Sequence, residues 1–283
     1  MKVLVTGANG FLGLGIVKEL LDRGCQVMAT DLSLEFCDDR AEKRECDLFS
    51  IKDPFEYFGK PDILLHLAWK DGFIHNADSH ILFLSQHHIF LKKMFESDVK
   101  QIAVLGTMHE VGFHEGSIDE NTNCSPLSLY GIAKNALRMD AEYLNKLNDK
   151  NLMWLRGFYI VGNTSHGSSI FSKIVQAFEN GETEFPFTMG LNQFDFLDYP
   201  NFCKQVTAAI LQTRIVGIIN ICSGRPEKLA TRVERFIAEN NFNISLQYGV
   251  FPDRPYDSKA IWGNNTKIEQ ILADEDSTVS DEQ

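Results

Sequence analysis

Residues 3–13 read Val-Leu-Val-Thr-Gly-Ala-Asn-Gly-Phe-Leu-Gly. The apolar start is typical of a short buried strand. Three glycines then follow at the spacing G-x-x-G-x-x-G, and apolar residues recur at helical intervals over residues 12–22, where Gly24 closes the pattern. A strand, a glycine turn and a helix in this order form a cradle in which a dinucleotide pyrophosphate meets a helix N-terminus. We therefore expect cofactor contacts from Gly7, Asn9, Gly10, Phe11, Leu12 and Gly13.

The rest of the chain continues the alternation of strands and helices. Strands are predicted at residues 26–30, 62–68, 101–106 and 151–158, with helices at 77–97 and 129–148. This pattern predicts an α/β fold with a doubly wound parallel sheet, a Rossmann fold, over residues 1–160. The looser pattern at 161–273 predicts a smaller C-terminal substrate-binding cap, some of whose segments can return to the Rossmann sheet. Residues 274–283 are polar and acidic, and we expect a frayed tail there.

Composition excludes several classes of function. The chain has 283 residues and a net charge of −12, which argues against binding to nucleic acid or to anionic lipid. No apolar run is long enough to span a membrane, and the first residues lead directly into a strand, so a cytoplasmic protein is expected. The six cysteines form no C-x-x-C pair, and the adjacent His87 and His88 point apart on a helix, so no metal site is expected.

The end of the second strand carries a candidate cofactor ligand. Asp31 lies about 20 residues beyond the glycine turn, where a carboxylate accepts hydrogen bonds from the adenosine ribose and repels a 2′-phosphate. No Arg or Lys follows at Leu32 or Ser33. The pattern favours NAD(H) over NADP(H), although a solvated loop carboxylate is the alternative. Asp47 and Leu48 could similarly lie near the adenine.

The predicted helix at 129–148 begins with a candidate acid–base pair. Tyr130 and Lys134 are four residues apart and so share one helical face, where an ammonium lowers the pKa of a nearby phenol. Such a tyrosine can exchange a proton with a sugar oxygen while hydride moves to or from a nicotinamide. Thr107, at the end of the preceding strand, can hydrogen-bond the same oxygen. Thr107, Tyr130 and Lys134 are the predicted catalytic residues.

Together these motifs resemble the extended short-chain dehydrogenase/reductases, the NAD-dependent epimerase/dehydratase family, over essentially the whole chain. The motifs are the glycine turn, Asp31, His66-Leu67-Ala68, Thr107, Tyr130 with Lys134, Asp195-Phe196-Leu197 and Arg254-Pro255-Tyr256-Asp257. The resemblance implies a nucleotide-diphosphate sugar as substrate, with cofactor contacts from Leu67, Ala68, Trp69, Tyr130 and Lys134. It also implies substrate contacts from Asn163, Ser168 and Ser169 and a diphosphate contact from Arg254, for which a surface ion pair is the alternative.

Two departures from the family pattern concern the nicotinamide side of the site. Trp69 replaces the small residue that usually follows His66-Leu67-Ala68. The helix after this strand also lacks the asparagine that the family commonly has there.

The residues after Thr107 bear on the type of reaction. Sugar 4,6-dehydratases have Asp-Glu at this place, whereas this chain has Met108-His109, so dehydration is disfavoured. The segment 106–112 is similar to a subgroup of reductases that act on 4-keto-6-deoxy sugar nucleotides, such as dTDP-4-dehydro-6-deoxyglucose, to give a dTDP-fucose-type product. His109 and Glu110 are each either a substrate ligand or a structural residue beside the site.

Three functions follow in order of preference. The first is NAD(P)H-dependent reduction of a 4-keto-6-deoxy sugar nucleotide with Tyr130 as proton donor. The second is a nucleotide-sugar 4-epimerase with tightly bound NAD, and the third is a non-catalytic NAD-sensing protein on the same fold. Family members commonly dimerise through the two long helices. The apolar faces of residues 81–95 and 133–147 permit a homodimer, although burial in the core explains these faces equally well.

Overall fold

Seven parallel strands form the larger sheet of this computed structural model, which describes residues 1–165, 169–252 and 258–281. The strands run in the order β11, β7, β5, β4, β1, β2, β3. Their bounds are Lys2–Thr6 (β1), Gln26–Asp31 (β2), Glu42–Glu45 (β3), Ile63–His66 (β4), Gln101–Thr107 (β5), Asn151–Gly157 (β7) and Gly217–Ile221 (β11). The predicted doubly wound sheet is confirmed. The order reverses between β1 and β4, so a ligand crevice is expected at their carboxyl ends.

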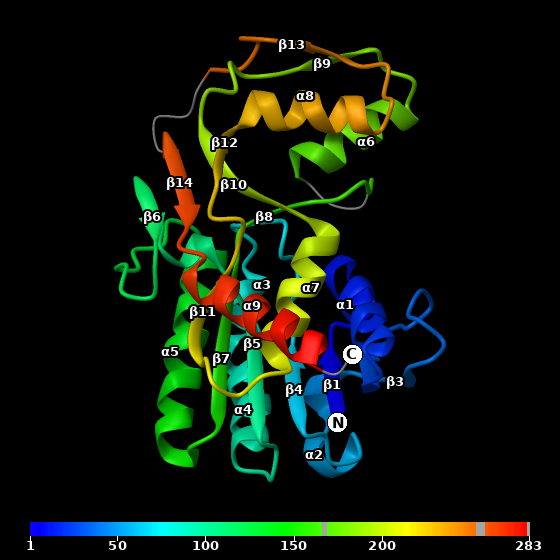
Figure 1. Cartoon of the computed structure of the whole chain (residues 1–283), viewed down its shortest axis with the longest axis vertical. Helices are drawn as coiled ribbons and strands as arrows, with labels where there is room; N and C mark the ends of the chain where they lie inside the picture. Colours follow the sequence, from blue (N-terminus) through cyan, green and yellow to red (C-terminus); the bar gives the residue numbers. More distant parts are fainter. Residues whose placement is uncertain (166–168, 253–257, 282–283) are drawn as a thin grey trace.

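Helices cover both faces of this sheet (Figure 1). One face carries α1 (Phe11–Asp22), α7 (Tyr199–Ile210) and α9 (Thr266–Asp281), and the other carries α2 (Pro54–Tyr57), α4 (Leu84–Phe95) and α5 (Leu129–Asn148). A hydrophobic core lies on each face of the sheet, and successive side chains of β1 point into opposite cores. Val3 and Val5 pack toward α1 and α7, whereas Leu4 packs toward α4 and α5.

The cap lies beyond the carboxyl ends of these strands, at the top of Figure 1. Its sheet has the order β12, β10, β14, β6, and β8 pairs with β10. The strands of this sheet are β6 (Gly116–Ile118), β8 (Tyr159–Val161), β10 (Gln193–Asp198), β12 (Pro226–Lys228) and β14 (Ala260–Gly263). Helices α6 (Ile170–Glu179) and α8 (Leu229–Glu239) pack on it through a core that includes Phe171, Phe196 and Phe236. A separate two-stranded sheet pairs β9 (Glu184–Pro186) with β13 (Ser245–Gln247).

The two parts are interleaved along the chain. After the cap strand β10, the chain returns to the Rossmann sheet as α7 and β11, enters the cap again as β12, and ends as α9 against the sheet. Buried Asp195 on β10 fastens these crossings, because its carboxylate accepts hydrogen bonds from the backbone N–H groups of Ser223, Gly224 and Gly263 at 2.8, 2.9 and 3.1 Å.

Two sequence expectations differ from the structure. The helix expected over 77–97 is divided at Phe83 into α3 (Ser79–Leu82) and α4. Both of these helices contact α5. The frayed tail expected from residue 274 is wrong, since α9 continues to Asp281. Asp274 pairs with Arg214 at 2.5 Å and Glu275 pairs with Arg23, so the acidic residues hold the helix to the domain.

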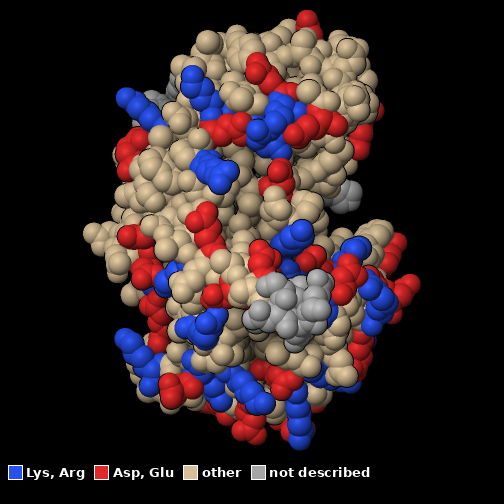
Figure 2. All heavy atoms as spheres, in the orientation of Figure 1, with Lys and Arg blue, Asp and Glu red and all other residues tan. Residues whose placement is uncertain are grey.

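On the face shown in Figure 2, basic and acidic side chains alternate across both the cap and the Rossmann part.

Candidate active site

The turn between β1 and α1 is built for close approach. Gly7 has a φ of +70°, and a Cβ atom there would lie 2.7 Å from the backbone nitrogen of Ala68. A Cβ on Gly13 would lie 2.3 Å from the carbonyl oxygen of Gly7. Gly10 is the N-cap of α1 and has no side chain to satisfy the first N–H groups of the helix. The turn therefore offers bare backbone donors at the positive end of a helix, which fits a pyrophosphate.

The carboxylate of Asp31 lies beside this turn. Its Oδ2 accepts a hydrogen bond from the backbone N–H of Asn9 at 3.0 Å, and its Oδ1 accepts one from Leu32 at 2.8 Å. The side chain of Asn9 in turn accepts from the N–H of Phe36 at 2.9 Å. These hydrogen bonds tie the turn after β1 to the end of β2 and hold the Asp31 carboxylate beside the turn.

Asp47 follows β3 at the same edge of the sheet. It is exposed and caps the short 3₁₀ helix η1 (Leu48–Ser50) by accepting from the N–H of Phe49 at 3.1 Å. Leu48 is buried in the core beneath it. Together the turn, Asp31 and this edge fit an adenine dinucleotide, and the predicted cofactor contacts at these residues stay a prediction.

Thr107, Tyr130 and Lys134 come together at the carboxyl end of β5. Tyr130 and Lys134 lie on the first two turns of α5, which begins at Leu129 because the Ser128 hydroxyl accepts from the N–H of Gly131 at 3.1 Å. The Thr107 and Tyr130 side chains share a hydrogen bond. Lys134 is buried and donates from Nζ to the carbonyl oxygen of Leu105 at 2.8 Å. The three predicted catalytic residues therefore lie close together in the folded chain.

The pKa shift of Tyr130 beside Lys134 differs from the shift expected from the sequence. Burial raises the pKa of the Tyr130 phenol above its ordinary value, although the hydrogen bond with Thr107 opposes this. The expectation that Lys134 lowers the pKa of this phenol is therefore wrong for the protein alone, because desolvation dominates. Burial also lowers the pKa of Lys134 to about 7, against the opposing charge of Glu110. A tyrosine that keeps its proton at neutral pH suits a proton donor.

Glu110 is not placed to contact a substrate, which corrects one sequence interpretation. Its side chain is completely buried behind the site and accepts from the Thr107 N–H at 2.7 Å and from Trp154 Nε1 at 2.9 Å. Arg156 lies 3.5 Å away and is equally buried. The carboxylate closes the capping box of η2 (Met108–Glu110) and fixes the backbone of Thr107.

His109 faces the site. Its ring lies 6.1 Å from that of Tyr130 and 6.4 Å from that of the cap residue Tyr159. Burial and the nearby His75 lower the pKa of His109 to about 4, so the imidazole is neutral at pH 7. It can exchange a hydrogen bond with a sugar hydroxyl, and its predicted role as a substrate ligand stays a prediction.

Three other histidines near Tyr130 and Lys134 were missed by the sequence argument. His75 stacks on Tyr130 with ring centroids 5.5 Å apart, and His80 lies 5.3 Å from the same ring. His87 on α4 stacks on Trp69 at 4.6 Å. It lies on the helix that lacks the family's asparagine. No single periodic pattern marks these residues, because His75 lies in the irregular segment between β4 and α3, His80 in α3 and His87 in α4.

Beneath Trp69 lies a buried polar chain from β1 to α4. The Thr6 hydroxyl is 2.8 Å from His66 Nδ1, and His66 Nε2 is 2.9 Å from His87 Nδ1. Burial lowers the pKa of His66 well below its ordinary value and that of His87 to about 3. Thr6 Oγ1 also accepts from the N–H of Ala68 at 3.2 Å, so this chain holds the segment Leu67–Trp69 at the expected nicotinamide side.

Of the predicted substrate residues of the cap, the structure describes Asn163 and Ser169, and each is engaged with another residue of the cap. Asn163 is exposed and donates to Asn240 Oδ1 at 2.6 Å. Ser169 caps α6 by accepting from the N–H of Ser172 at 3.1 Å. Ser168 and Arg254 lie outside the described residues.

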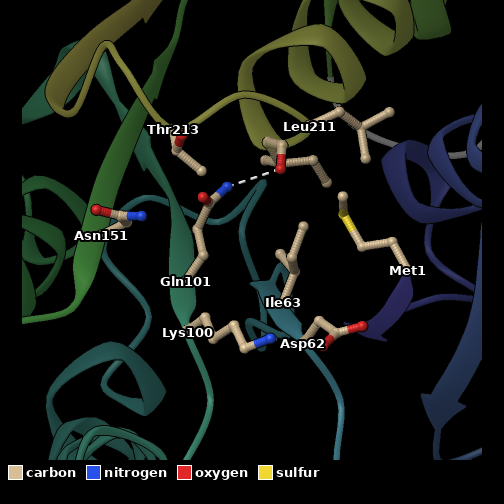
Figure 3. Close-up of a pocket in the computed structure, with 9 residues that line it drawn as sticks. Met1, Asp62, Ile63, Lys100, Gln101, Asn151, Leu211 and Thr213 are labelled. Atoms are coloured by element: carbon tan, nitrogen blue, oxygen red, sulfur yellow. Dashed lines mark hydrogen bonds and ion pairs between the residues drawn. The ribbon is translucent and has the colours of Figure 1, made fainter.

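A cavity of about 360 Å³ lies at the opposite edge of the sheet (Figure 3). Asp62, Gln101, Asn151 and Leu211 are among its lining residues, and the Gln101 amide donates to the carbonyl oxygen of Ile210 at 2.7 Å. Gln101 begins β5 and Thr107 ends it, so about 20 Å of strand separates this cavity from the catalytic residues. It is not the active site.

Within the described ranges, no helix is both long and apolar enough to cross a membrane, and no group of three or more potential metal ligands is found.

Comparison with known proteins agrees with this geometry. The model of the NAD dependent epimerase/dehydratase family matches residues 3–222. The dTDP-6-deoxy-L-talose 4-dehydrogenase (NAD(+)) of Aggregatibacter actinomycetemcomitans is 41% identical over 269 residues, covering 93% of this chain and 99% of that protein.

Two solved structures show the same fold. The UDP-N-acetylglucosamine 4-epimerase of Methanobrevibacter ruminantium M1 has a TM-score of 0.83 at 19% identity, covering 95% of this chain and 91% of that one. The UDP-glucuronic acid 4-epimerase of Bacillus cereus, in complex with UDP-glucuronic acid and NAD, has a TM-score of 0.81 at 19% identity, covering 96% and 93%. The predicted resemblance is confirmed: this chain is an oxidoreductase-type enzyme that belongs to the NAD-dependent epimerase/dehydratase family.

Proposed function

We propose that the protein catalyses NAD-dependent oxidation and reduction at C4 of a dTDP-linked 6-deoxyhexose, with reduction of the 4-keto sugar as the favoured direction. The observation that carries this proposal is the meeting of Thr107, Tyr130 and Lys134 beside the glycine turn. The relative at 41% identity supports the sugar class, because its name describes the same bond change at C4 on dTDP-6-deoxy-L-talose.

Each residue has a defined task in reduction. The bound cofactor would supply the hydride as NADH in reduction and accept it as NAD in oxidation. Tyr130 donates its phenolic proton to the C4 oxygen, and its raised pKa keeps that proton in place until transfer. The Thr107 hydroxyl lies next to the phenol and donates a hydrogen bond to the same oxygen as charge develops there. The Lys134 ammonium then stabilises the phenolate that remains.

Asp31 supports NAD(H) as the preferred cofactor. A carboxylate held by the N–H groups of Asn9 and Leu32 at the ribose position would repel the 2′-phosphate of NADP(H).

The structure supports reduction over dehydration. Dehydratases need a carboxylic acid and a base directly after the catalytic threonine. Here Met108 is buried, His109 is neutral at pH 7, and the Glu110 carboxylate is turned away into the protein.

A homodimer through α3, α4 and α5 is also proposed. These helices expose large apolar side chains on their outer side, which favours burial against a second copy. The residues are Ile81, Leu82, Ile89, Ile132, Met139, Tyr143 and Leu147. Sedimentation equilibrium of the wild type and of Met139→Lys tests this: a dimer that the substitution weakens is expected, and a monomeric wild type would exclude it.

The function is tested with NADH and two sugars: dTDP-4-dehydro-6-deoxyglucose, and the 4-keto sugar made by oxidising dTDP-6-deoxy-L-talose at C4. We expect stoichiometric loss of NADH absorbance with at least one sugar and, in the reverse direction, NADH formation from dTDP-6-deoxy-L-talose and NAD. Tyr130→Phe should slow the reaction by about 10²- to 10⁴-fold while leaving NAD binding unchanged.

The alternative, a 4-epimerase with tightly bound NAD, gives a different result. Such an enzyme interconverts C4 epimers of an intact nucleotide sugar without net change in NADH. Epimer formation at constant NADH absorbance would therefore replace the reductase proposal, and NAD binding without turnover of any sugar would favour an NAD-sensing protein.

A further inference from the structure

Trp69 lies between the cofactor edge of the sheet and the catalytic helix. It is half-buried, three residues after the end of β4. The Lys134 Nζ atom stands 3.9 Å from the centroid of its indole ring. The ring of His87 on α4 also stacks on the indole, with ring centroids 4.6 Å apart and planes at 19°. The indole face is therefore the platform on which the buried ammonium rests.

His80 fixes the orientation of this indole. Trp69 Nε1 donates to His80 Nδ1 at 3.0 Å, so that nitrogen carries no proton. The proton of His80 therefore lies on Nε2, which donates to the carbonyl oxygen of Ile74 at 3.0 Å. His80 is buried, and a single tautomer satisfies both contacts. The indole is consequently held at its edge by His80 and on its face by His87.

The segment that Trp69 and His80 anchor also caps the catalytic helix. The carbonyl oxygen of His75 accepts from the N–H of Tyr130 at 2.9 Å, and Asn76 Oδ1 accepts from that of Leu129 at 3.3 Å. The His75 ring covers the Tyr130 ring at 5.5 Å and 14°. One short loop thus contacts both members of the acid–base pair.

We propose that Trp69 is a positioning residue for Lys134: its indole face holds the ammonium form of the lysine against the site, and its loop fixes the first turn of α5. The proposal rests on the catalytic assignment of Lys134 made above. A cation over an indole is stabilised in its charged form, so removing the ring should make Lys134 lose its proton at a lower pH. The titratable side chains that also face Lys134 are Glu110 from η2, His66 from β4 and His87 from α4.

The first measurement needs neither cofactor nor substrate. Protein labelled with ¹³C at lysine Cε is titrated by NMR, and Lys134→Met assigns the signal. In the wild type, the Lys134 signal should be displaced by the indole ring current and titrate near neutral pH. Trp69→Leu should remove the displacement and lower the midpoint by about one pH unit. Trp69→Phe, which keeps an aromatic face, should give intermediate values and serves if the leucine variant fails to fold.

The second measurement is the pH dependence of the reductase rate. Stabilisation of the Tyr130 phenolate requires the ammonium form of Lys134, so the rate should fall as pH rises through the pKa of Lys134. Trp69→Leu should move this fall about one pH unit lower, so that the variant is about two- to fivefold slower than the wild type between the two midpoints and approaches about tenfold slower above the wild-type midpoint. A loss of stability alone would scale the whole profile and leave its midpoint in place.

The outcomes separate this inference from the proposed function. Unchanged Lys134 titration and signal position in both Trp69 variants would overturn the inference even if the sugar is reduced. The expected NMR changes without turnover of either 4-keto sugar would support the role of Trp69 and refute the reductase assignment.

Discussion

Alanine at Gly7 tests the cofactor turn, with alanine at Gly24 as the matched control. Both glycines have similar left-handed φ angles, +70° and +77°. Alanine in that region costs about 1–2 kcal/mol, offset by about 0.4–1 kcal/mol from the restricted unfolded chain, and both variants share these effects. Only at Gly7 would the new Cβ meet backbone, 2.7 Å from the nitrogen and 2.9 Å from the Cα of Ala68, whereas the space at Gly24 is open.

The difference between the two variants therefore measures the close approach of β1 to the segment after β4. Displacing packed backbone costs about 1–3 kcal/mol. For a chain of 283 residues, each kcal/mol lowers Tm by about 1.7 °C, so Gly7→Ala should melt about 2–5 °C below Gly24→Ala. Differential scanning calorimetry gives these values. Isothermal titration should show NAD binding weakened at least about tenfold in Gly7→Ala, equivalent to 1.4 kcal/mol, and unchanged in Gly24→Ala.

Two results would refute this reasoning. Equal melting temperatures would mean that the backbone at Ala68 does not approach Gly7 as described. A lower melting temperature for Gly7→Ala with unaltered NAD affinity would mean that the turn is structural and that the cofactor binds elsewhere.

Three further predictions concern charge. Burial lowers the pKa of His66 and His87 in the folded protein below their values in the unfolded chain, so the free energy of unfolding should fall as pH drops below about 6.5, by about 1.4 kcal/mol per pH unit for each histidine. Thermal melts from pH 7 to 5 should therefore show a melting temperature that falls with pH, and His87→Gln should reduce this dependence. A melting temperature that does not change with pH would contradict the prediction. Asp31→Asn should narrow the preference for NAD(H) over NADP(H), measured as the ratio of kcat/KM values, and an unchanged ratio would remove Asp31 from the ribose site. Glu110→Ala should lower stability by about 3–5 kcal/mol because it leaves the buried Arg156 without its carboxylate partner, whereas Glu56→Ala, which removes an exposed ion pair with Lys60, should cost less than about 1 kcal/mol. Similar losses in denaturant titrations would argue against the buried network.

Local patterns predicted most of the fold and the catalytic residues. The turn from Gly7 to Gly13 and the pair Tyr130 and Lys134 are visible in the sequence because the chemistry depends on spacings within one turn or one helix. Likewise, the alternation of strands and helices implies parallel strands with helical crossovers, so the larger sheet follows from short-range information.

The sequence could not predict which way each side chain points, toward the site or into the core. Glu110 is three residues from Thr107, yet η2 turns it into the core. It meets Trp154 and Arg156 there, which lie on β7, a strand that is far away in the sequence but next to β5 in the sheet. The platform beneath Lys134 was missed for a related reason. Trp69 and its supports come from a loop and a separate helix, and only the folded topology brings them together.

The interleaving of the cap with the sheet has a consequence for synthesis. In the described part of the chain, β6 pairs only with β14, which joins Gly116 to Ile261 across about 140 intervening residues. At about 5–20 residues per second, a ribosome takes about 7–30 s to make that stretch. During this interval, β6 has left the exit tunnel with an open edge while the N-terminal strands and helices can already fold. Nascent chains that stop before residue 260 should therefore be more prone to chaperone capture than the finished protein, even though their cofactor turn is complete.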